Sequence, residues 1–156
     1  MIKISSNKFN GRDYIEASKE RILDAKKLLE KSENIIGAIY FSGVAVECIF
    51  RAYITLQSKE FDDKHDLSRL YETSMIGQKL DEREKKFFTV KFKCINSFWR
   101  NNLRYCSGVQ LKRAMAHELV KEKKKFKNIY NYLNYKYKLL IEASESIVNM
   151  GVEEWN

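Results

Sequence analysis

NIIGAIYFSGVAVECIFRAYITL, residues 34–56, is the stretch that decides the fold of this chain. It is apolar almost all the way round, too long for a strand, and broken only by two glycines. A helix that is apolar on every face is either a membrane span or the central helix of a helical protein. Glu47 and Arg51 favour the second, because they lie one turn apart, can pair, and would each be costly inside a bilayer. We therefore expect a buried central helix wrapped by amphipathic helices.

The composition indicates an all-α protein of one domain. The chain has 156 residues, no proline and six glycines, which favours long helices joined by short connections over a strand-rich fold. Short connections imply antiparallel neighbours, so we predict an up-and-down antiparallel bundle of four to six helices. Residues 1–11 are expected to form a flexible lead-in and residues 12–156 a single helical domain. The first residues lack the apolar core of a signal peptide, which predicts a cytoplasmic protein.

Apolar residues recur at helical spacing outside the central stretch as well. The expected helices cover 12–32, 34–56, a short segment carrying Leu67, Leu70 and Tyr71, then 81–99, 109–121 and 129–150, with RNNLRYCSG (100–108) as a loop. Asn34 or Ser32 is expected to cap the central helix, and Asp63 or Asp66 the short one. Asp81 and Glu84 have the spacing of a capping box.

The last helix is expected to turn Tyr130 and the apolar residues that follow toward the core, and to end at Gly151 as its C-cap. Trp155 is expected to fold back onto the bundle.

The charge pattern leaves two interpretations open. The formal net charge is +8, and a basic surface with aromatic side chains attracts phosphate backbones and can stack on bases. Many small helical proteins are equally basic without binding nucleic acid, and most of the Tyr and Phe residues fall at core spacing. The lysine-rich run 121–127 is either a solvated turn or a funnel for a charged ligand.

No metal or cofactor is expected. His65 lies near Asp62, Asp63 and Asp66, but a second His in ligand spacing and a CxxC pair are both missing from the sequence. The three cysteines have no paired spacing, which is typical of free thiols in a reducing compartment. No glycine-rich phosphate loop or nucleophile elbow occurs.

Glu47 and Arg51 have two readings. They form either a structural ion pair that orders the core or one side of a cleft that binds a polar ligand. Burying both charges costs several kcal/mol unless each is well paired, so a functional role would explain their presence.

Several segments resemble HEPN domains. Residues 38–47, AIYFSGVAVE, followed by Arg51 and Ala52, resemble the second-helix signature small-x-Tyr-Leu-x-Gly-x-x-x-Glu with a basic residue and Ala after it. His65-Asp66-Leu67 resembles the entry to the third helix of this family. Trp99 and Leu103-Arg104-Tyr105 resemble the Trp…Leu-Arg-Tyr segment of a bacterial and archaeal branch. Together the matches cover most of residues 20–105 in the expected order.

The resemblance implies an all-α bundle, commonly a homodimer, in a superfamily rich in RNA-cleaving toxins and defence proteins. Other members are partners of small nucleotidyltransferases or bind nucleotides or RNA. Active members cleave RNA without a metal, using an Arg that stabilises the phosphate and a His four to six residues later that acts as general acid or base.

This chain departs from that motif. Arg100 is followed by Cys106 where a His would be needed, the interval from Arg113 to His117 is one residue too short, and Lys112 has the spacing but not the guanidinium. The candidate catalytic residues are Arg104, Arg113, His117 and His65. The candidate ligand-binding residues are Glu47, Arg51, Trp99 and Tyr105.

Each candidate has a structural alternative. Arg104 could bind phosphate through two N–H groups, and Tyr105 could donate a hydrogen bond or stack on a base, or the two could lock a loop onto the bundle. Arg113 and His117 share one face of a helix, and that face could simply be solvated.

The leading hypothesis is an HEPN-like module that binds RNA or a nucleotide, of toxin–antitoxin or defence type, with a degraded nuclease motif. The first alternative is a metal-independent ribonuclease. The second is a non-catalytic partner that docks a nucleotidyltransferase or an antitoxin.

Overall fold

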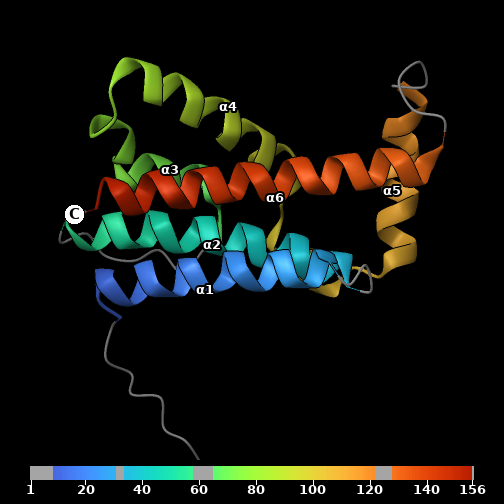
Figure 1. Cartoon of the computed structure of the whole chain (residues 1–156), viewed down its shortest axis with the longest axis horizontal. Coiled ribbons are helices and arrows are strands. Elements are labelled where there is room, and N and C mark those ends of the chain that lie inside the picture. Colours follow the sequence, from blue (N-terminus) through green and yellow to red (C-terminus); the bar gives the residue numbers. More distant parts are fainter. Residues whose placement is uncertain (1–8, 31–33, 58–64, 122–127, 156) are drawn as a thin grey trace, which may run out of the picture.

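The computed structural model of the chain describes residues 9–30, 34–57, 65–121 and 128–155 (Figure 1). These residues form helices and no strand, in the order α1 (Gly11–Glu30), α2 (Ile35–Thr55), α3 (Leu67–Ser74), η1 (Ile76–Gln78), α4 (Glu82–Phe98), η2 (Asn101–Tyr105), α5 (Gly108–Lys121) and α6 (Ile129–Glu153), where η marks a 3₁₀ helix. The predicted all-α bundle is confirmed.

Helix α2 is the centre of the bundle. It packs against α1, α6 and α3, and its Phe50 ring contacts Tyr71 of α3. Its side chains are buried on nearly every face, which is why the sequence carries no polar stripe there. By length and composition α2 would also cross a membrane, with a mean hydropathy of 1.6, but 61 % of that apolar window is buried inside the protein. A core helix meets the same criterion.

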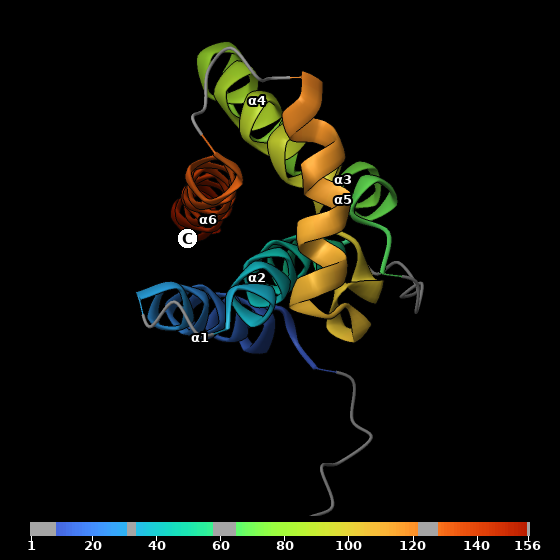
Figure 2. The same ribbon diagram turned by 90° about the vertical axis from the view of Figure 1, so that its right-hand side faces the viewer.

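The four long helices α1, α2, α4 and α6 alternate in direction along the chain (Figure 1). Helix α5 is the exception to this up-and-down order. It crosses one end of the bundle at a steep angle to α6 (Figure 2). Leu111 and Met115 are its buried side chains among those the structure describes. Helix α5 is therefore attached to the core through a narrow contact.

Three helices begin at side-chain caps that the sequence predicts. The Asn34 side chain accepts the N–H of Gly37 at 2.9 Å at the start of α2. Asp66 caps α3. Asp81 and Glu84 form the predicted capping box at the start of α4. The alternative caps Ser32 and Asp63 lie outside the described residues.

Three predictions about the ends of the chain have a structural outcome. Helix α1 begins at Gly11, which is buried against Trp155. The lead-in predicted for residues 1–11 therefore extends one residue too far. Residues 1–8 lie outside the described part of the chain. Trp155 folds back as expected, with its ring centroid 5.4 Å from that of Tyr53. The predicted C-cap at Gly151 is wrong, because α6 continues to Glu153. Gly151 is buried where a Cβ atom would meet Ile49 of α2.

Two further predictions are wrong. Tyr130 is 61 % exposed, and Tyr132 takes the buried position instead. The segment expected to be a loop after α4 forms η2, a 3₁₀ helix whose last residue is Tyr105. A 3₁₀ turn needs no apolar periodicity, so the polar sequence gave no signal of it.

Candidate functional site

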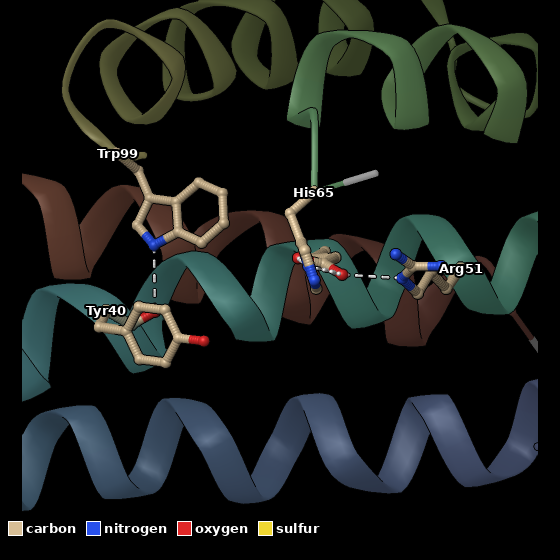
Figure 3. A network of polar contacts seen from close by, with 5 residues as sticks. Tyr40, Arg51, His65 and Trp99 are labelled. Carbon is tan, nitrogen blue, oxygen red and sulfur yellow. Dashed lines mark hydrogen bonds and ion pairs between the residues drawn. The ribbon is translucent and has the colours of Figure 1, made fainter. Parts of the chain in front are cut away.

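A buried carboxylate on α2, that of Glu47, contacts the side chains of Arg51 and His65. Glu47 is 4 % exposed, and its Oε1 accepts the Nε–H of Arg51 at 2.8 Å (Figure 3). The imidazole Nδ1 of His65 lies 2.9 Å from Oε1 and 3.0 Å from Oε2 of the same carboxylate. Because a carboxylate only accepts hydrogen bonds, Nδ1 carries the proton. The structure thus brings together three of the predicted site residues.

Local structure explains this arrangement. Glu47 and Arg51 are one turn apart on α2, which places them on the same face. His65 directly precedes Asp66, the N-cap of α3, and α3 is anchored through the buried Leu67 and Leu70. The start of α3 therefore delivers the His65 ring to the middle of α2.

The surroundings of Glu47 are poorly hydrated. Burial raises the pKa of the neighbouring Cys48 thiol to about 12, with the charge of Glu47 adding to the effect and that of Arg51 opposing it. Burial also raises the pKa of Tyr14, which faces the same charges from α1. In such a setting a carboxylate needs hydrogen-bond and charged partners, and Arg51 supplies a charge while His65 supplies a further hydrogen bond. The thiols of Cys48, Cys94 and Cys106 are all free and partly buried.

His65 connects this ion-pair network to a pocket. The His65 side chain is 41 % exposed. The pocket has a volume of about 380 Å³ and is lined by His65, Asp66, Leu67, Ser68, Asn96, Trp99 and Arg100. Nη1 of Arg100 donates to the backbone carbonyls of Asn96 and Trp99, at 2.6 and 2.7 Å, which fixes the guanidinium at the C-terminal end of α4. One pocket thus holds an imidazole and a guanidinium.

Trp99, a predicted ligand-binding residue, is mainly a structural wall of this pocket. It is 2 % exposed, and its Nε1–H donates to the carbonyl of Tyr40 at 3.1 Å (Figure 3). Its ring also stacks on Tyr40, with centroids 6.3 Å apart. Gly43 makes room for the indole, since a Cβ atom at that position would overlap the ring. Tyr40 and Gly43, one turn apart on α2, therefore form the binding surface for the Trp99 side chain.

Arg104 and Tyr105 lie together in η2, outside the lining of the pocket. The Arg104 guanidinium is 4.8 Å from the centroid of the Tyr105 ring. Its hydrogen bond to the Tyr40 hydroxyl raises the pKa of Arg104 above its ordinary value. Tyr105 is 75 % exposed. Arg104 neighbours Tyr40, and Tyr40 stacks on Trp99, which lines the pocket.

Arg113 and His117 do not join this site. Both side chains are exposed on α5. In the described part of the chain neither makes a hydrogen bond or ion pair with the Glu47, Arg51 and His65 cluster. Arg113 and His117 do share one face of α5, and that face is exposed to solvent. The structural alternative fits their positions.

The arginine that shares a pocket with His65 is Arg100, which the sequence did not single out as a site residue. Arg100 does begin the incomplete Arg…His motif, in which Cys106 stands where a His would be needed. Its partner imidazole comes from a distant segment. Only the packing of α3 beside the end of α4 makes the pair visible.

Among the residues that the structure describes, no group of three or more His, Cys, Asp or Glu side chains is placed to hold a metal ion. Asp62, Asp63 and residues 122–127 of the lysine-rich run lie outside that part of the chain.

Compared with protein-family models, with curated proteins and with solved structures, the chain matches none of them. The resemblance to HEPN domains therefore stays a prediction that depends on the residues quoted for it.

Proposed function

We propose that this protein is an HEPN-like module that binds the phosphate of RNA or of a nucleotide in the pocket beside His65. The observation that carries the proposal is that His65, held by a buried Glu47, and Arg100, held by two backbone carbonyls, line the same pocket. Both side chains are fixed before any ligand arrives. A pre-organised site loses less entropy on binding.

The chemistry of Arg100 suits an anion with several oxygens. A guanidinium presents five N–H donors in a fixed fork that matches phosphate. The two carbonyls engage Nη1, which leaves Nη2 and Nε for a ligand. Among the described residues no carboxylate lies within ion-pair distance of this guanidinium. Its positive charge is therefore available to a phosphate.

The other polar groups of the pocket are compatible with this ligand. Asn96 and Ser68 provide an amide and a hydroxyl that can donate. The Asp66 carboxylate would repel an anion, but it accepts the N–H groups of Ser68 and Arg69 at 3.0 and 3.2 Å, which offsets its charge. A volume of about 380 Å³ is within the usual range for small ligands, about 300–1,000 Å³.

Binding of a labelled single-stranded RNA in EDTA, followed by fluorescence anisotropy, tests the proposal. We expect Arg100→Ala to weaken binding about tenfold or more, because a hydrogen-bonded charge is removed. Arg83→Ala is the matched control, since it removes the same charge from the opposite, exposed end of α4. Binding should also weaken as salt is raised. Equal affinities of the two variants, or no binding by the wild type, would refute the proposed site.

A second candidate function, metal-independent cleavage of RNA, is favoured by the Glu47–His65 geometry. Glu47 fixes the tautomer of the ring, so that Nε2 can accept a proton from an attacking ribose hydroxyl. Arg100 would stabilise the charge that develops on the phosphate. Loss of EDTA-resistant cleavage in His65→Gln and Arg100→Ala supports this role. His117→Gln, Arg104→Ala and Arg113→Ala test the sites predicted from the sequence.

The homodimer, the nucleotidyltransferase or antitoxin partner, the toxin–antitoxin role and the cytoplasmic location implied by the sequence stay predictions.

A further inference from the structure

Tyr105 is the most exposed large apolar side chain in the described part of the chain, at 75 %. It ends η2, immediately beside Arg104. The Arg104 guanidinium lies against the Tyr105 ring, 4.8 Å from its centroid, in the range of a cation–π contact. An exposed aromatic ring held by a cation is available for stacking on its other face.

Arg104 ties this ring to the proposed phosphate pocket. The Tyr40 side chain is a polar neighbour of Arg104 that raises the pKa of the guanidinium, and the Tyr40 ring stacks on Trp99. Trp99 in turn lines the pocket that contains His65. The series Tyr105, Arg104, Tyr40 and Trp99 therefore forms a continuous set of contacts from an exposed platform to the pocket wall.

We propose that Tyr105 and Arg104 form a base-stacking subsite, so that the ligand of the site is single-stranded RNA. A phosphate binds beside His65 and Arg100 while the base of a neighbouring nucleotide stacks on Tyr105. This inference rests on the proposed function, since it uses the same pocket. Only an unpaired base exposes its face to a protein ring, so a duplex cannot use the platform.

The contacts of Arg104 define the subsite. The guanidinium has an aromatic neighbour on each side, the Tyr105 ring and the Tyr40 side chain, so it covers one face of the Tyr105 ring and leaves the other open. Arg104 also adds a positive charge beside the platform, which attracts the phosphate backbone of a bound strand. A mononucleotide that occupies only the pocket would gain nothing from Tyr105.

Fluorescence anisotropy with a labelled single-stranded RNA, the duplex of the same sequence and an unlabelled mononucleotide as competitor tests the subsite. We expect Tyr105→Ala to weaken single-strand binding about tenfold, the effect of one stacked base, without changing competition by the mononucleotide. Tyr105→Phe keeps the ring and should retain the affinity. The matched control is Tyr130→Ala. Tyr130 is likewise an exposed tyrosine beside a cation, with its ring centroid 5.1 Å from Nζ of Lys112, and it does not line the pocket.

The outcomes separate the subsite from the proposed function. If Tyr105→Ala binds the single strand as tightly as Tyr130→Ala while Arg100→Ala still weakens it, the subsite is wrong and the phosphate pocket stands; Tyr105 would then be a contact for another macromolecule. Equal affinity of the wild type for duplex and single strand also overturns the subsite. No binding of any probe by the wild type overturns both proposals. Circular dichroism confirms that the variants fold, which the exposure of Tyr105 leads us to expect.

Discussion

The carboxylate of Glu47 receives the Nδ1–H of His65 between its two oxygens, at 2.9 and 3.0 Å, although the residues are 18 positions apart. This contact joins the buried centre of α2 to the half-exposed start of α3. Glu47 also accepts a hydrogen bond from Arg51, so one buried carboxylate orients both side chains. The network therefore orders the protein core and orients a side chain of the pocket at the same time.

The first prediction concerns the stability that depends on Glu47. We expect Glu47→Gln to lower the free energy of unfolding by about 3 kcal/mol, because the largely buried Arg51 would lose the charge of Glu47. Urea unfolding followed by circular dichroism measures the change.

A surface ion pair supplies the control for Glu47. Lys26 and Glu145 join α1 to α6 at 2.7 Å with both side chains substantially exposed. Glu145→Gln should lower the free energy of unfolding by less than about 1 kcal/mol. If both substitutions have the same small effect, the buried network does not stabilise the fold.

The second prediction concerns the packing of Trp99 against Gly43. We expect Gly43→Ala to destabilise the protein by about 2 kcal/mol, because the added methyl group would overlap the indole ring. Gly108→Ala is the comparison, since a Cβ atom there has no neighbour within 4 Å and alanine favours the helix. Thermal unfolding should show a lower midpoint for the first variant and an equal or higher one for the second. An unchanged midpoint for Gly43→Ala would contradict the close approach.

The third prediction is a loss of stability at alkaline pH. Burial raises the pKa of Cys48 from 9.0 to about 12, so the folded state keeps a proton that the unfolded chain releases. The free energy of unfolding should therefore fall as the pH rises through this interval. In Cys48→Ala the slope should be smaller but not zero, because burial also raises the pKa of Tyr137 to about 12. Urea unfolding at a series of pH values checks this, and identical slopes would contradict it.

The fourth prediction concerns the stability of α5 relative to α2. Since Leu111 and Met115 are the buried side chains described for α5, its amides should exchange with deuterium faster than those of α2. Met115→Ala should speed exchange in α5 further and leave α2 nearly unchanged. Mass spectrometry of peptides from the two helices measures both effects. Equal protection of α5 and α2 in the wild type would show that α5 is part of the core.

Much of the secondary structure follows from short-range signals in the sequence. Asn34 and the Asp81–Glu84 pair satisfy backbone N–H groups within three residues of themselves, so their effect does not depend on the rest of the fold. The pairing of Glu47 and Arg51 was likewise readable from helical spacing. Predictions are wrong where a residue is determined by packing against a segment far away in the sequence. Gly151 is an example, because it is small to accommodate Ile49 of α2 and does not end the helix.

The sequence by itself determined which segments form α-helices and that α2 is central, because apolar periodicity and caps act over one or two turns, whereas the 3₁₀ helix η2 was predicted as a loop. Only the tertiary structure decided the site. It separates Arg113 and His117 from His65, and it places Arg100 in the pocket of His65 because α3 packs beside the end of α4. It also turns Trp99 inward onto Gly43 and leaves Tyr105 exposed. These relations depend on how helices pack across the chain, and no local pattern in the sequence records them.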